Sequence, residues 1–144
     1  MDLYLILFLF ATLWIGPFWF AMLLRPNHSF TYKLMNGPWF FIGPLLIWFF
    51  IFLVDFGYIS QLSPALESDN NLIEFLAIGL ANKTGFTATW AHIVVGDIFV
   101  TRWIWNKSLN LNLGVWLIRF SVFFGVILMP FGLLLHLLFV KIKK

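Results

Sequence analysis

The chain has 144 residues, of which 62% are hydrophobic and only 10% are charged, and its mean hydropathy is +0.95. A soluble domain typically has about 25% charged residues, so this composition predicts an all-α integral membrane protein and excludes a separate soluble enzyme domain. The absence of cysteine excludes thiolate chemistry, iron–sulfur clusters and cysteine-rich zinc sites. The net charge of +3 comes from basic residues in short loops and at the tail, which excludes nucleic-acid binding in favour of a membrane.

Two apolar segments dominate the N-terminal half. Residues 3–24 have the length of a membrane-crossing helix, roughly 20 residues at 1.5 Å each, and Gly16-Pro17 should kink it. A polar and basic loop follows over residues 25–37. The second span is predicted at residues 38–58, with Asp55 near its far end.

A short polar and acidic region separates the second span from the third. Within it, residues 71–80 read as an amphipathic helix capped by Asp69 or Asn70, with Glu74 in its first turn. We expect this short helix to lie at the membrane interface.

The C-terminal half contains the remaining two spans. The third is predicted at residues 85–105 and the fourth, which is unusually long, at residues 113–140. The fourth should bend at Met129-Pro130-Phe131-Gly132. The sequence therefore predicts a single domain, residues 1–144, that forms a four-helix transmembrane bundle with both termini on one side.

Orientation depends on the basic residues. In a four-span arrangement the loop after the first span shares a side with Lys107, while Lys83 shares the other side with the tail Lys141, Lys143 and Lys144. The basic counts on the two sides nearly cancel, and we favour a cytoplasmic position for the first loop.

Three ionisable residues lie at five-residue intervals in the third span: His92, Asp97 and Arg102. A charged group at membrane depth costs at least ~2.5 kcal/mol on insertion scales, so each needs a sheltered position. A step of five residues turns a helix by about 140°, so the three side chains point in different directions. The third span should therefore be the central helix, with neighbours on several sides.

Depth suggests partners for these residues. Asp97 and Arg119 should lie at similar depth, roughly 9 to 10 Å from one side, and we predict that they pair. His92 should lie level with Gly125, where the missing side chain leaves room for a ligand or for a close helix. His136 should lie at the opposite end, near Asp55 and Lys83, so we expect no metal site. An Asp–Arg pair is equally compatible with a purely structural contact, and His92 with a satisfied core histidine.

The same helix carries a family resemblance. The order Trp90-x-His92, Asp97-x-Phe99 and Arg102-Trp103-Ile104 resembles the signature of the abscisic-acid-deficient-four-like family, small membrane proteins that plants need to make neoxanthin from violaxanthin. The stretch from Phe124-Gly125 to Met129-Pro130-Phe131-Gly132-Leu133-Leu134 is similar to the final helix of that family, and Arg25-Pro26 matches the end of its first span.

The resemblance implies a lipid-soluble polyene or carotenoid substrate and an isomerisation in which an epoxide opens while a proton leaves a neighbouring carbon. Such a reaction needs an acid and a base and no cofactor in principle. It implies catalytic roles for His92 as acid or base, Asp97 as its partner and Arg102 as an electrostatic anchor. The remaining candidate substrate contacts are Thr89, Trp90, Thr101, Trp103, Gly125 and Arg119.

Two other classes of function stay open. One is a carotenoid-binding or assembly subunit without catalysis, and the other is a haem- or quinone-binding membrane module. In every case we expect an integral membrane protein, in a bacterial inner membrane or in a plastid or thylakoid-type membrane. Membrane lipid is an expected partner. A homo-oligomer is also compatible with the sequence.

Overall fold

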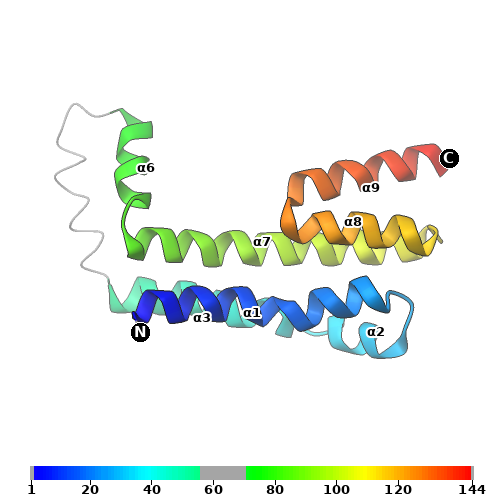
Figure 1. Ribbon diagram of the computed structural model, residues 1–144, viewed down its shortest axis with the longest axis horizontal. Coiled ribbons are helices and arrows are strands. Elements are labelled where there is room, and N and C mark those ends of the chain that lie inside the picture. The colour runs from blue at the N-terminus through cyan, green and yellow to red at the C-terminus, as the bar shows by residue number, and fades with distance from the viewer. Residues whose placement is uncertain (1, 56–70, 144) are drawn as a thin grey trace.

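The computed structural model describes residues 2–55 and 71–143, and within these ranges the secondary structure is entirely helical (Figure 1). The helices are α1 (Leu3–Leu24), α2 (Ser29–Met35), α3 (Trp39–Val54), α6 (Leu72–Leu80), α7 (Lys83–Asn110), α8 (Val115–Ile127) and α9 (Met129–Lys143). Two helical segments, Leu3–Leu24 and Ser29–Val54, are long and apolar enough to cross a membrane by length and composition.

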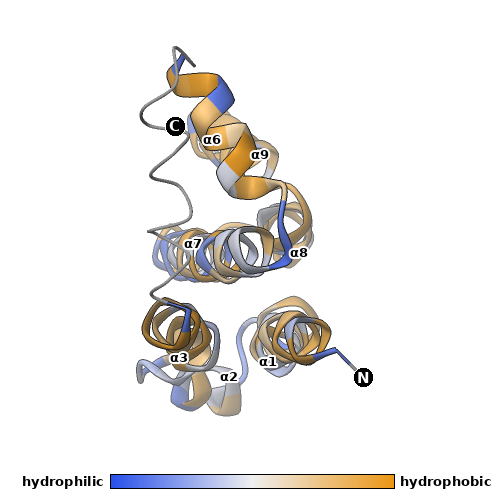
Figure 2. Ribbon diagram, turned by 90° about the vertical axis from the view of Figure 1, so that its left-hand side faces the viewer, coloured by the Kyte–Doolittle hydropathy of each residue, from blue (hydrophilic) through white to orange (hydrophobic). Residues whose placement is uncertain are grey.

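The long helices lie side by side. Figure 2 views them nearly end-on, with α1 and α3 in one row, α7 and α8 in a second row, and α9 above. Helix α7 packs against α1, α3, α6, α8 and α9, which confirms the prediction that the helix at residues 85–105 is central in the packing. Its buried residues face these neighbours, with Ala91, Ile98 and Ile104 fully covered.

Residues 25–37, which the sequence predicts as a loop, contain a short helix, α2. Helix α2 begins after His28, whose ring accepts a hydrogen bond from the backbone N–H of Phe30. The buried Thr31 hydroxyl donates to the carbonyls of Ala21 and Arg25, at 3.2 and 2.7 Å. These bonds satisfy carbonyls at the end of α1 and fold the corner back onto the bundle.

Most element boundaries lie near the predicted ones. Helix α1 has the predicted bounds, and α3 ends at Val54, so that residues 56–58 of the predicted second span lie outside the described residues. Helix α7 continues to Asn110 through the predicted loop. The cap of α6 is Asn71, which forms a capping box with Glu74, whereas the predicted caps Asp69 and Asn70 lie outside the described residues.

The fourth span is the main correction to the predicted fold. The sequence predicts one bent helix at residues 113–140, but the chain reverses at Leu128, and α9 runs back beside α8 (Figure 1). Pro130 has no N–H for the carbonyl of Val126, which weakens a continuous helix at this point, although α1 and α3 do continue through Pro17 and Pro44. A Cβ atom on Gly132 would collide with the backbone of Phe124 and Gly125, which shows how closely α9 approaches α8.

The reversal changes the position of the C-terminus. Because α9 runs in the same direction as α7, the C-terminal end of α9 lies at the opposite end of the molecule from the N-terminus (Figure 1). The prediction that both ends of the chain share one side is therefore wrong, and so is the prediction that Lys141 shares a side with Lys83.

Candidate functional site

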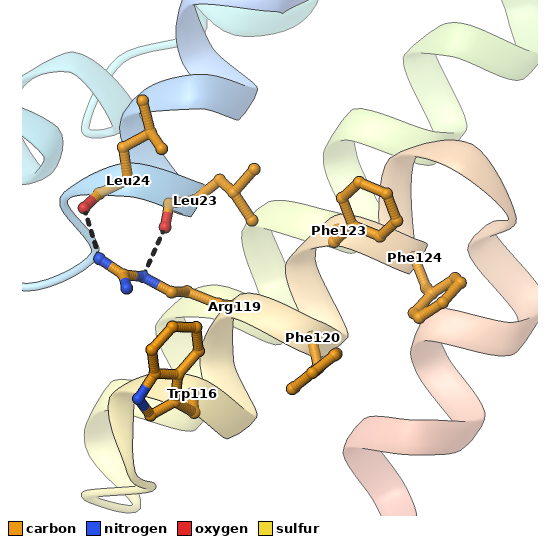
Figure 3. A pocket seen from close by; sticks show the side chains of 7 residues that line it. All are labelled: Leu23, Leu24, Trp116, Arg119, Phe120, Phe123 and Phe124. Atoms are coloured by element: carbon orange, nitrogen blue, oxygen red, sulfur yellow. Dashed lines mark hydrogen bonds between the residues drawn. The ribbon is translucent and has the colours of Figure 1, made fainter.

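A pocket lies between the end of α1 and α8 (Figure 3). It has a volume of about 450 Å³ and is almost entirely apolar. Its lining consists of Leu23, Leu24, Trp116, Arg119, Phe120, Phe123 and Phe124. We call it the Arg119 pocket, because the guanidinium of that residue is its one charged group.

Arg119 reaches from α8 across to α1 (Figure 3). Its Nε donates to the carbonyl of Leu23 at 3.1 Å and its Nη2 donates to the carbonyl of Leu24 at 3.0 Å. These carbonyls belong to the last turn of α1, where no intrahelical donor is available and the helix dipole is negative. The guanidinium also lies 5.1 Å from the ring centroid of Trp116. These bonds use two of its five N–H groups and leave the others for a further acceptor.

A second pocket lies at the other end of α1, against the start of α7. Its volume is about 300 Å³, and it is lined by Asp2, Tyr4, Leu5, Phe8, Lys83, Phe86 and Thr87. We call it the Tyr4 pocket. At its outer rim Lys83 forms an ion pair with Asp2, and the hydrogen bond from Lys83 holds the pKa of that carboxyl below its usual range.

Three hydroxyl and carboxyl groups meet behind the Tyr4 pocket. The Tyr4 hydroxyl donates to Oδ2 of Asp55 at 3.0 Å, and Oγ1 of Thr84 lies 2.8 Å from the same Oδ2 and 2.9 Å from the Tyr4 oxygen. The three residues come from α1, the end of α3 and α7, so this network ties three helix ends together. It also fixes the position of Tyr4, which lines the pocket.

Aromatic residues line α1 between the two pockets. The Trp90 ring lies 5.0 Å from the Phe8 ring, and its Nε1 donates to the Thr12 hydroxyl at 2.9 Å. Farther along α1, Trp19 packs against Phe123 with 6.0 Å between centroids. Aromatic ring pairs therefore lie along α1 between the two pockets.

The three predicted catalytic residues do not meet in the structure. His92 is exposed, and neither its ring nor the half-buried Asp97 carboxylate makes a hydrogen bond or ion pair with the described residues. Arg102 donates from Nε to the carbonyl of Met35 at 2.8 Å, at the end of α2, and its guanidinium lies 5.2 Å from the Phe40 ring. As the sequence predicts, the side chains point in different directions.

The predicted Asp97–Arg119 pair is wrong. Arg119 bonds to the carbonyls that end α1, and the described residues contain no ion pair between it and a carboxylate. The sequence predicts the two residues at the same depth, but the free carbonyls at the negative end of the α1 dipole are the acceptors that Arg119 uses.

The predicted position of His136 is also wrong. Its Nδ1 lies 3.0 Å from Oγ of Ser108 near the end of α7, and its ring packs edge-on against Trp103 at 5.4 Å. Both Ser108 and His136 are buried. The reversal at Leu128 moves His136 away from Asp55 and Lys83, to the other end of the molecule. Within the described residues, no group of three His, Asp or Glu side chains could hold a metal ion.

The predicted substrate contacts divide into two groups. Trp90 and Arg119 flank the pockets, whereas Thr101 and Gly125 pack helices together. Thr101 donates to the carbonyl of Asp97 at 2.6 Å, and a Cβ atom on Gly125 would lie 2.7 Å from the Thr101 hydroxyl. The sequence left two roles open for Gly125, room for a ligand or a close helix. In the structure its missing side chain allows the close approach of α7. Thr89 is partly buried on α7.

Sequence reasoning missed Tyr4, Thr84 and the two leucines at the end of α1. Tyr4 and Asp55 are 51 residues apart, and no local pattern relates them. The sequence signal that could have identified Tyr4 was a single tyrosine near the start of an otherwise apolar segment. Such an amphipathic ring often marks the membrane–water interface.

A protein-family model matches most of the chain. The model described as ABA DEFICIENT 4-like matches residues 6–136, which include most of α1, all of α7 and α8, and the motifs quoted above. No curated protein and no solved structure matches the chain significantly. The chain belongs to the ABA DEFICIENT 4-like family.

Proposed function

We propose that this protein lies in a membrane and binds a long, rod-shaped isoprenoid of the carotenoid class along α1. The family name supports a link to carotenoids. The apolar helices support a membrane location, because many large apolar side chains on them are exposed and would face lipid. The single observation that carries the proposal is the spacing of the two pockets.

Each pocket has a lining residue on the same side of α1. Leu23 of the Arg119 pocket follows Leu5 of the Tyr4 pocket by 18 residues, which is five helical turns, so both side chains face the same way. The distance along the helix is about 27 Å. This is close to the ~30 Å thickness of a hydrocarbon core, which a rod-shaped C40 isoprenoid can span.

The surface between the pockets can accept a narrow apolar chain. Gly16 follows Leu5 by 11 residues, so it lies within about 20° of the same side of α1, and a Cβ atom there would meet nothing within 4 Å. The flat rings of Trp90 and Phe123 border this strip and offer large apolar faces to a polyene.

Each end of the strip has a polar group. Small-molecule sites are mostly apolar, with a few polar groups that fix the orientation of the ligand. The Tyr4 phenol and the Arg119 guanidinium have this role in the proposal, because each borders an apolar pocket and retains hydrogen-bonding capacity. We therefore expect a ligand with oxygenated ring ends.

Isomerisation of an epoxidised carotenoid is the second candidate function, and Asp97 favours it. Asp97 follows Phe86 by 11 residues and Trp90 by 7, so it lies within about 20° of the side of α7 that carries both rings. His92 is rotated by about 140° from Asp97. A carboxylate can take the proton from carbon and return it to the epoxide oxygen, so Asp97 is the preferred acid–base group, with His92 and Arg102 outside the strip.

The test compares two glycine variants of the purified protein. Gly16→Phe should fill the strip without a clash, and Gly96→Phe is its control, because Gly96 is also open but is rotated by about 100° from Asp97 on α7. Both are expressed in a carotenoid-producing bacterium, purified in mild detergent and analysed by absorption and by mass of the lipid extract. We expect pigment in the wild type and in Gly96→Phe, and its loss in Gly16→Phe. A colourless wild type, or equal pigment in both variants, contradicts the proposal.

A further inference from the structure

Charged side chains are segregated between the two ends of the molecule. At the end where α1 finishes, the exposed charged residues are all basic: Arg25, Lys33, Lys107 and Lys141. The acidic side chains among the described residues lie elsewhere, with Asp2, Asp55 and Glu74 at the opposite end and Asp97 within α7. We call the first the basic end and the second the acidic end.

The acidic end contains one basic residue among those described, and it is neutralised. Lys83 forms an ion pair with Asp2, and the lysine side chain is largely exposed. The basic residues at the other end have no carboxylate partner within the described residues. The two ends therefore differ in net charge as well as in composition.

The α8–α9 hairpin produces this segregation. Because the chain reverses at Leu128, the tail that carries Lys141 returns to the end where α1 finishes (Figure 1). The contact between Ser108 and His136 fixes α9 beside the last turns of α7. A single long fourth span would instead have placed the tail at the acidic end.

The turn of the hairpin is compatible with a position inside lipid. Backbone groups in hydrocarbon must be satisfied within the protein. The N–H of Leu128 bonds to the carbonyl of Phe124, and the N–H groups of Phe131 and Gly132 both bond to the carbonyl of Leu128, at 2.8 to 3.0 Å. Pro130 has no N–H to satisfy. The exposed side chains at the turn, Leu128 and Phe131, are apolar.

We infer that the chain crosses the membrane three times, through α1, α3 and α7, with α8 and α9 as a re-entrant hairpin, and that the basic end binds the anionic headgroups of the cytoplasmic leaflet. The inference rests on the proposed membrane location. Lysine and arginine near span ends favour the cytoplasmic side, and clustered basic residues attract anionic lipid. The N-terminus then lies on the opposite side from the C-terminus.

The absence of cysteine allows a direct topology test. Three exposed positions are replaced one at a time, Asn27→Cys and Ile142→Cys at the basic end and Leu72→Cys at the acidic end. Spheroplasts that express each variant in the inner membrane are treated with a membrane-impermeant maleimide. We expect Leu72→Cys to react in intact spheroplasts, and Asn27→Cys and Ile142→Cys to react only after permeabilisation.

Two results would overturn the inference, and they have different meanings. If Ile142→Cys and Leu72→Cys react from the same side in a membrane-bound protein that retains pigment, the topology is wrong and the proposed function stands. If the unmodified chain is recovered in the soluble fraction after an alkaline wash, the proposed membrane location fails as well.

Lipid retention tests the partner of the basic end. The purified protein is placed in vesicles of phosphatidylcholine with or without phosphatidylglycerol, and the lipid that remains bound after detergent extraction is measured by mass spectrometry. Lys33→Gln, Lys107→Gln and Lys141→Gln should each reduce phosphatidylglycerol retention by about fivefold. Lys83→Gln at the acidic end is the matched control and should leave it unchanged. Equal effects of all four substitutions would overturn anionic lipid as the partner.

Discussion

The hydroxyl oxygen of Ser108 on α7 lies 3.0 Å from Nδ1 of His136 on α9, and both side chains are buried. This contact joins the end of the central helix to the returning arm of the hairpin. It holds α9 beside the last turns of α7, at the end of the molecule where the chain returns after the reversal at Leu128.

The Ser108–His136 contact should be measurable by a double-mutant cycle. Ser108→Ala leaves a buried imidazole nitrogen without its partner, which typically costs about 1–3 kcal/mol. In His136→Phe the further change Ser108→Ala should cost much less, because the nitrogen is already absent. The measurement is thermal unfolding in detergent, followed by circular dichroism. Strictly additive effects of the two substitutions would show that the contact does not form.

The close approach of α8 and α9 depends on glycine. A Cβ atom on Gly132 would meet backbone atoms of Phe124 and Gly125, which cannot move without displacing the hairpin. Gly132→Ala should therefore destabilise the protein by about 1–3 kcal/mol or more. Gly96→Ala is the control, since a Cβ atom there meets nothing within 4 Å. Similar unfolding midpoints for the two variants would contradict the hairpin.

Tyr4 should distinguish oxygenated ligands from hydrocarbons. Tyr4→Phe keeps the ring that lines its pocket and removes the hydroxyl that borders it. We expect weaker binding of a dihydroxylated carotenoid by about 5- to 10-fold, equivalent to one hydrogen bond, and unchanged binding of its hydrocarbon parent. Binding is measured by pigment retention after exchange in detergent. Equal losses for both ligands would indicate that Tyr4 acts only on the fold.

The isomerase candidate predicts different results for two residues of α7. Asp97→Asn should lower turnover of an epoxidised carotenoid by about a hundredfold or more, because the acid–base group is removed. His92→Gln should leave turnover unchanged, because His92 is exposed and lies about 140° from Asp97 around the helix. Both variants should retain pigment. Loss of turnover in His92→Gln alone would reverse this assignment.

The bounds of α1 follow directly from the sequence. The apolar run is long enough to form one helix, Asp2 accepts a hydrogen bond from the N–H of Tyr4 as its cap, and Arg25-Pro26 ends it. The sequence also predicts the central position of α7, although the premise that each of its ionisable side chains is sheltered fails for His92, which is exposed. These features are local, or depend only on helical periodicity.

The hairpin and the pockets could not be predicted in the same way. The apolar pattern of residues 113–140 is the same whether a helix bends or reverses at Pro130, and the choice depends on the packing of Gly132 against Gly125. Arg119 binds main-chain carbonyls, which every sequence contains and no pattern marks. The Tyr4–Asp55–Thr84 network joins three helices that are distant in sequence.

The most direct test of ligand binding along α1 is a fluorescence titration. The chain has eight tryptophans, and Trp19, Trp90 and Trp116 lie at or between the two pockets, where a bound polyene would quench them. If the proposal is correct, a C40 dihydroxylated carotenoid should occupy both pockets, whereas a C20 isoprenoid of the same end group should reach only one. The account predicts saturable quenching by the C40 ligand with an affinity at least about tenfold higher than that of the C20 ligand. Equal affinities, or quenching that does not saturate, would contradict it.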